Sequence, residues 1–176
     1  ISYLTVTPEI INTGEELTIS SYFYDAEGLA GNSIKVFSSL DGLLYNESYT
    51  LWGEDFVIFR DNLSTGFHEF YLVYTDSDGI SVTSEIANAT INSKPTVELS
   101  GPEAITSGES APIVALGTDV DGSIDVYKWY IDGSLIITEE QGNKPFEIPN
   151  ELEVGNYLIS VIVIDSVAAL TPKAEI

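Results

Sequence analysis

The sequence contains no cysteine, no methionine and one histidine, His68, in 176 residues. Without cysteine the chain has no disulfide framework, no thiolate nucleophile and no zinc–thiolate site. The absence of methionine, also at position 1, indicates a processed or excised segment rather than a complete translation product. No apolar run reaches the roughly 18 residues of a membrane-spanning helix, and no charged-then-apolar leader opens the chain, so we expect no membrane span or signal peptide within this segment.

Basic residues are also scarce. The 6 lysines and arginines are outnumbered by 28 aspartates and glutamates, which gives a formal net charge of −22. Such a surface repels phosphate backbones and anionic lipid headgroups, so it argues against nucleic-acid binding and electrostatic attachment to membranes. Two interpretations of the charge stay open: it favours divalent cations or a salt-rich medium outside a cell, or it serves solubility alone.

The chain contains an internal repeat. The sequence PEIINTGE at residues 8–15 recurs as PEAITSGE at residues 102–109, an offset of 94 residues. Solenoid and propeller repeats have periods of roughly 20–50 residues, so a repeat of this length indicates a duplicated domain. We predict one domain over residues 1–94 and a second over residues 95–176.

The offset shrinks along the repeat, as insertions in loops permit. An offset of 90 matches Ile34 with Ile124 and Phe56 with Phe146. An offset of 89 then matches residues 66–76 with residues 155–165 and leaves residues 88–94 without counterparts. The second unit is therefore expected to end early, inside or just after its last strand.

Short stretches of alternating apolar residues, bounded by Gly, Asn, Asp and Pro, are typical of half-buried strands. No stretch keeps a helical apolar period over three turns. We expect strands over residues 3–7, 17–24, 34–40, 56–60, 68–74, 80–91 and 157–164, with further counterparts after Pro95. The pattern predicts an all-β protein made of two tandem immunoglobulin-like antiparallel β-sandwiches of about seven strands each.

The second unit resembles the PKD-type immunoglobulin-like domain. The resemblance rests on the acidic turn DVDGSI at residues 119–124, the strand YKWY at residues 127–130, and GNY at residues 155–157 followed by alternating aliphatics up to Asp165. It implies an extracellular sandwich domain of the kind found in archaeal and bacterial surface proteins and in secreted hydrolases, usually without catalytic activity of its own.

The first unit departs from that pattern. Its turn reads DAEG at residues 25–28, and in the repeat Ser39 stands where Trp129 stands. Trp129 is expected in the core. Trp52, which has no repeat counterpart, either fills the gap left by Ser39 or forms a surface platform that stacks on a sugar ring or a partner.

His68 replaces Tyr157 in the repeat. The position of Tyr157 resembles the tyrosine corner of such sandwiches, in which the ring packs and its polar tip bonds the nearby backbone. An imidazole can take the same role, so we interpret His68 as a packing residue. A lone histidine with no cysteine also cannot build a zinc site.

The acidic turns are candidate calcium sites. In the second unit the ligands would be Asp119 and Asp121, with Asp165 at the end of the closing strand; in the first unit they would be Asp25 and Glu27. Calcium takes six to eight oxygen ligands, of which closely spaced carboxylates supply several. Asp and Gly also form tight turns by bonding their own backbone, and both interpretations stay open. The carboxylate pairs could in principle serve glycoside hydrolysis, but no pocket-forming architecture is indicated.

Three N-glycosylation sequons begin at Asn46, Asn62 and Asn88, all in the first unit. In an extracellular protein from an archaeon or a eukaryote, we expect at least one of them to carry sugar.

Two functions follow from these patterns. The first is a non-catalytic structural protein of the cell surface, a subunit or segment of an extracellular filament, surface layer or stalk. Its partners would be other copies of itself or neighbouring domains, joined by strand addition between chains with Ile1–Thr7 as a donor strand. The alternative is a carbohydrate- or protein-binding accessory module of a secreted hydrolase or adhesin. Neither is an enzyme or needs a cofactor other than calcium.

Overall fold

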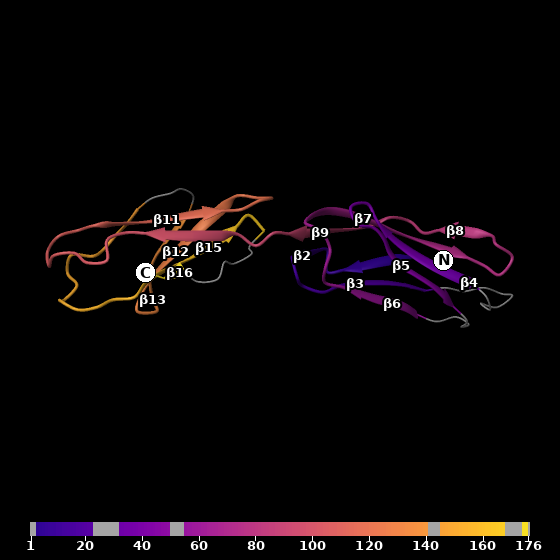
Figure 1. The fold of residues 1–176 in the computed structure, drawn as a ribbon, viewed down its shortest axis with the longest axis horizontal. Helices are drawn as coiled ribbons and strands as arrows, with labels where there is room; N and C mark the ends of the chain where they lie inside the picture. Colours follow the sequence, from indigo (N-terminus) through magenta and orange to yellow (C-terminus); the bar gives the residue numbers. More distant parts are fainter. Residues whose placement is uncertain (1–2, 23–31, 50–54, 141–144, 168–173, 176) are drawn as a thin grey trace. The chain divides into compact units, whose positions relative to one another are not determined.

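The computed structural model describes residues 3–22, 32–49, 55–140, 145–167 and 174–175. The chain divides into two compact units, Ile1–Asn92 and Ser93–Ile176, close to the boundary that the repeat predicts. Each unit is a sandwich of two β-sheets, unit 1 drawn from indigo to magenta and unit 2 from there to yellow (Figure 1). The described residues of the protein include no helix long and apolar enough to cross a membrane.

Unit 1 has nine strands in its described part. One sheet has the order β1-β3-β6, and the other has the order β2-β9-β7-β4-β5 with β8 also paired to β7. The strands are β1 Leu4–Thr7, β2 Ile10–Asn12, β3 Leu17–Tyr22, β4 Asn32–Ser38, β5 Gly42–Tyr49, β6 Asp55–Arg60, β7 Gly66–Thr75, β8 Ser81–Thr83 and β9 Ala87–Asn92.

Unit 2 has seven strands in its described part, in sheets of order β10-β11-β14 and β13-β12-β15-β16. The strands are β10 Thr96–Ser100, β11 Pro112–Thr118, β12 Ile124–Ile131, β13 Ser134–Glu140, β14 Phe146–Glu147, β15 Ile159–Asp165 and β16 Ala174–Glu175. The described strands of both units thus form the predicted immunoglobulin-like β-sandwiches.

Alternation of apolar side chains builds both cores, because successive side chains of a strand point to opposite faces. β3 and β7 show the pattern most clearly, with every second residue buried. The core of unit 1 lies between its two sheets and includes Leu17, Ile34, Phe56, Phe70 and Ile91. The core of unit 2 is built around Trp129, with Ile113, Phe146, Val161 and Val163.

Strand register corrects two matches of the repeat. Ile34 pairs with Tyr74, and the unit 2 counterpart of Tyr74, Val163, pairs with Tyr127, so Ile34 corresponds to Tyr127 rather than to Ile124.

Trp129 pairs with Val161, and the unit 1 counterpart of Val161, Leu72, pairs with Val36. The pairing of β4 with β5 also shifts its register immediately after Val36. The pairing of β12 with β13 shifts its register in the same way immediately after Trp129. The core tryptophan of unit 2 therefore corresponds to Val36, and the match with Ser39 was wrong.

In unit 1 an aromatic side chain from β5, the strand next to β4, occupies the space that Trp129 occupies in unit 2. Tyr45 of β5 lies opposite Val36, and its ring meets Phe56 edge-on at 5.2 Å between centroids. In unit 2 Trp129 itself stacks on Phe146 at 5.0 Å. Both units thus place an aromatic pair between their sheets, although the larger ring comes from different strands.

Two other expectations change. The run predicted over residues 80–91 is divided into β8 and β9, and β9 pairs with β2 in parallel, so the larger sheet of unit 1 is not purely antiparallel. The proposed donor segment Ile1–Thr7 is already engaged, since Leu4–Thr7 pairs with β3 and the side chain of Val6 is buried.

Candidate functional site

The acidic turn of unit 2 connects β11 to β12. Asp119 Oδ1 accepts a hydrogen bond from the backbone N–H of Asp121 at 3.4 Å, the local bond that makes aspartate a turn residue. Gly122 packs against the Asp119 carboxylate, which would have to shift to accommodate a Cβ at this position. The Asp121 carboxylate accepts the backbone N–H of Ser93 at 3.0 and 3.2 Å, so it ties the turn to the start of unit 2.

Asp165 ends β15 near this turn. Its side chain is buried, and Oδ1 accepts the backbone N–H of Val167 at 2.9 Å. Burial raises the pKa of Asp119 above its ordinary value, and the negative charges of Asp121 and Asp165 raise the pKa further. The structure therefore brings the three predicted carboxylates close enough to influence one another.

These residues fit a cation only in part. Asp119 Oδ2 is buried without a hydrogen-bond partner, and a cation would satisfy such an atom. In the part of the chain that is described, however, no group of three or more His, Cys, Asp or Glu side chains is arranged to hold a metal ion. Calcium at Asp119, Asp121 and Asp165 stays a prediction, and Asp25 and Glu27 lie outside the described residues.

His68 lies at the centre of a polar network inside unit 1. Its side chain is 0% exposed and stacks on Phe70. Nε2 lies 2.7 Å from the backbone carbonyl of Ser64, so this nitrogen carries the proton and donates it. Nδ1 lies 2.7 Å from Ser38 Oγ and, in the neutral ring, accepts the hydroxyl proton of that serine. Every polar atom of the neutral imidazole thus has a partner.

Asp41 approaches the same ring nitrogen. Its Oδ2 lies 3.8 Å from His68 Nδ1 and accepts the backbone N–H of Ser64 at 3.0 Å. Burial raises the pKa of Asp41, but the hydrogen bonds from Ser64 outweigh the effect of burial and hold the pKa below its ordinary value.

The Ser38, His68 and Asp41 side chains do not have the geometry of a catalytic triad. In a triad the nucleophile and the carboxylate bind opposite nitrogens of the imidazole, whereas here both approach Nδ1 and the other nitrogen holds a backbone carbonyl. Ser38 and His68 are also buried in the core of unit 1. The network stabilises the fold, as predicted for His68.

Tyr157 takes the equivalent place in unit 2 and confirms the predicted tyrosine corner. Its hydroxyl donates to the backbone carbonyl of Glu153 at 2.9 Å, four residues upstream. His68 bonds Ser64, also four residues upstream. The imidazole and the phenol therefore make the same contact in the two units.

The three sequon asparagines all have exposed side chains. Asn46 lies on β5, Asn62 lies in the connection between β6 and β7, and Asn88 lies on β9 opposite Glu69. Their accessibility fits glycosylation, and whether they carry sugar stays a prediction. Trp52, the candidate aromatic platform, lies outside the described residues.

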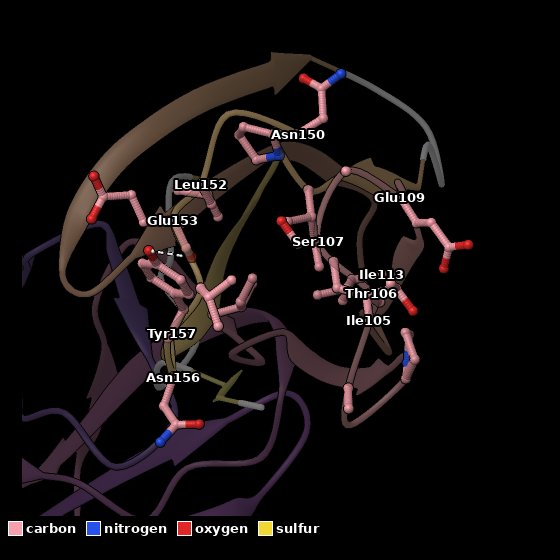
Figure 2. Close-up of a pocket in the computed structure, with 18 of the residues that line it drawn as sticks. Ile105, Thr106, Ser107, Glu109, Ile113, Asn150, Leu152, Glu153, Asn156 and Tyr157 are labelled. Carbon is pink, nitrogen blue, oxygen red and sulfur yellow. Dashed lines mark hydrogen bonds between the residues drawn. The ribbon is translucent and has the colours of Figure 1, made fainter.

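Unit 2 has a cavity at one end that no pattern in the sequence predicted. It has a volume of about 400 Å³ and is partly open to solvent. Figure 2 shows Ile105 and Thr106 on one wall and Leu152 and Tyr157 on the opposite wall. The floor includes the core residue Ile113.

No protein-family model and no curated protein matches the chain. Similar solved structures include the fibronectin(III)-like modules of CbhA from Clostridium thermocellum, at 22% identity and a TM-score of 0.46 over 98% of this chain and 90% of that chain. Dimeric latent PorU from Porphyromonas gingivalis is similar at 15% identity and a TM-score of 0.37, over 99% of this chain and 19% of that chain. Since both TM-scores are below 0.5, neither likeness carries an argument about function.

Proposed function

We propose that the chain is a non-catalytic structural segment of an extracellular protein, in a filament, a surface layer or a stalk. The supporting observation is that the fold encloses its histidine and the neighbouring serine in the core, where they pack rather than react. The sole histidine and its serine neighbour are enclosed in the core, with each nitrogen of the imidazole hydrogen-bonded within unit 1.

The composition supports the same role. A net charge of −22 suits a cation-rich medium outside a cell, and a cysteine-free sandwich does not depend on redox conditions. Two copies of one sandwich in tandem are a common way to build a spacer.

Labelling of intact source cells with a membrane-impermeant amine reagent tests this role. Lys35, Lys94 and Lys128 provide amines, and we expect their peptides to be labelled without lysis. Labelling that appears only after lysis would contradict the proposal. A cytoplasmic protein of known location serves as the control for cell integrity.

One feature favours the alternative role, an accessory module that binds carbohydrate or protein. Phe37 of β4 and Tyr71 of β7 are cross-strand neighbours, and their half-buried rings stack at 5.0 Å on the outer side of the larger sheet of unit 1. Aromatic faces of this kind bind sugar rings and partner proteins. A glycan screen tests this: retention that is lost in Tyr71→Ala supports the module, and no retention on any glycan removes its carbohydrate form.

A further inference from the structure

A row of three side chains on β7 lies on the outer face of the larger sheet of unit 1. Phe67, Glu69 and Tyr71 point outward, because the residues between them are buried in the core. The Phe67 side chain is 57% exposed, and Tyr71 is half-buried. Two aromatic rings therefore stand on this face, one on either side of a carboxylate.

The neighbouring strand β9 places a sequon asparagine beside this row. Asn88 pairs directly with Glu69, and its side chain points outward because the next residue, Ala89, faces the core and is 2% exposed. In an antiparallel pair, residues that lie diagonally, two positions along the opposite strand, are about 7–8 Å apart, within reach of aromatic side chains. Phe67 and Tyr71 are the two diagonal neighbours of Asn88. A sugar attached to Asn88 would thus lie over Glu69 with an aromatic ring on each side.

The surroundings of Asn88 leave room for such a sugar. The Asn88 side chain is exposed, and β2 pairs only with the later part of β9, from Thr90 to Asn92. On the same side of β7, β9 pairs with residues 66–70 and β8 pairs with residues 73–75. Tyr71 lies between these two ranges, so none of the described strands places a paired residue beside its ring.

The chemistry of the row suits a neutral sugar. The faces of a pyranose ring present C–H groups, which pack on the electron-rich face of an aromatic ring, and its hydroxyl groups donate hydrogen bonds to a carboxylate such as Glu69. β4 and β7 carry one lysine and one glutamate, so the centre of this sheet has no net charge in a chain of net charge −22. A neutral ligand therefore fits this face better than a charged partner does.

The other two sequons lack these surroundings. Asn46 pairs with Lys35 and has one aromatic diagonal neighbour, Phe37, whose ring already stacks on Tyr71 at 5.0 Å. Asn62 lies outside the strands, in the connection between β6 and β7. Asn62 therefore offers the same acceptor group without the aromatic row, which makes it a matched control.

From these observations we infer that Asn88 carries an N-linked oligosaccharide and that its first sugar packs on the row formed by Phe67, Glu69 and Tyr71. The donor is an oligosaccharide linked to a lipid phosphate. A bond forms between the side-chain nitrogen of Asn88 and C1 of the first sugar, the bond from C1 to the phosphate oxygen breaks, and the amide proton and the lipid phosphate leave. This inference rests on the extracellular location proposed above, because such transfer acts on exported chains.

Thermal unfolding of single-site variants tests the contact. The chain is secreted from a host that N-glycosylates, and mass spectrometry of its glycopeptides establishes the occupancy of each sequon. Asn88→Gln should lower the melting temperature of unit 1 by about 3–8 °C, because it removes a sugar packed on aromatic rings. Asn62→Gln should leave that temperature unchanged. In protein made by bacteria without N-glycosylation, Asn88→Gln should melt as the unmodified chain does, which separates loss of the sugar from loss of the asparagine.

Nuclear magnetic resonance of the glycosylated protein tests the position of the sugar. The C–H protons of the sugar on Asn88 should shift upfield relative to those of the sugar on Asn62, because they lie over aromatic rings. Tyr71→Ala and Phe67→Ala should each reduce the upfield shift and the thermal gain from the sugar. Tyr71→Phe should keep both, since the packing needs the ring and not the hydroxyl.

Three results would overturn the inference. Native protein that is labelled on intact cells but carries no sugar on Asn88 would remove the modification and leave the extracellular location standing. A sugar on Asn88 that neither stabilises unit 1 nor shows the upfield shift would remove the contact with the row. Self-association of unmodified native protein that is lost in Phe67→Ala, measured by sedimentation velocity, would make the occupant a second copy of the chain.

Discussion

At the scale of single residues, His68 and Tyr157 show how one contact is made by two different side chains. Each bonds a backbone carbonyl four residues upstream, His68 from within β7 and Tyr157 from just before β15. The imidazole is also enclosed and bonds Ser38, whereas the phenol lines the cavity of unit 2 and is half-buried. The histidine is therefore expected to contribute more to the stability of its unit than the tyrosine does.

Replacing His68 with alanine should destabilise unit 1 by about 2–4 kcal/mol, because it leaves a cavity and removes the partners of Ser38 and of the Ser64 carbonyl. Tyr157→Phe should cost unit 2 only about 0.5–1.5 kcal/mol, the contribution of one hydrogen bond. Urea denaturation measures both. Phe67→Ala, at the exposed neighbouring position of the same strand, is the control and should cost less than about 1 kcal/mol. An equally small loss in His68→Ala would contradict the packing role.

The raised pKa of Asp119 predicts a pH dependence of unit 2. The folded state holds this proton more tightly than the unfolded state, so the stabilisation is present at low pH and is lost as pH rises through the raised value, above the ordinary ~3.9 of aspartate. Asp119→Asn should flatten that part of the curve of stability against pH. An unchanged slope in the variant would show that the carboxyl titrates normally.

Calcium makes a different prediction for the same residue. If Asp119, Asp121 and Asp165 bind the ion, calcium raises the melting temperature of unit 2, and a chelator reverses the effect, since a ligand of the folded state alone must stabilise it. Asp165→Asn is expected to abolish the shift, and magnesium at the same concentration is the control. A melting temperature that is indifferent to both calcium and chelator rules out a structural ion there.

At the scale of strands, the sequence predicted the strands whose apolar residues alternate clearly. It did not predict the features that depend on which strands pair with one another. β1, β3, β4, β6, β7 and β15 lie within a few residues of their expected ranges because a buried or half-buried side chain recurs at every second position. β5 was missed because its residues GLLYNESY alternate weakly. The parallel pairing of β2 with β9 joins residues about 80 apart, which no local pattern reveals.

The candidate site was predictable to a similar extent. Local sequence located the acidic turn and the tyrosine corner, since both depend on bonds within a few residues. The match of Trp129 with Ser39 was wrong because the position of the length change between the units cannot be read from the sequence. The register places Val36 there instead. Tyr45 was not identified, because its role depends on the strand opposite.

Because the core aromatic ring comes from different strands in the two units, a tyrosine on the strand next to β12 should partly compensate for the loss of Trp129. Trp129→Val should destabilise unit 2 by about 3–5 kcal/mol, as expected for removal of a fully buried large ring. Ile137 lies opposite Trp129 as Tyr45 lies opposite Val36, so adding Ile137→Tyr should restore part of the loss. A double-mutant cycle measures the coupling between the two positions. Strict additivity would contradict the equivalence of Val36 and Trp129.

At the scale of the whole molecule, the charge of −22 is the dominant property of the surface. Like charges repel one another most in the compact folded state, so the charge lowers stability at low ionic strength. Raising monovalent salt from 0.01 M to 0.15 M shortens the Debye length from about 30 Å to about 8 Å. The melting temperatures of both units should therefore rise, and sucrose at matched osmolality serves as the control. A fall with salt would mean that attractive charge pairs outweigh the repulsion.

Imaging of the native assembly tests the proposed structural role most directly. Material released from the surface of source cells would be purified under mild conditions, labelled with an antibody against this segment and viewed by electron microscopy. A structural segment predicts label at regular intervals along a filament, lattice or stalk. Label found only on dispersed single molecules, with no ordered assembly in the native material, would contradict it.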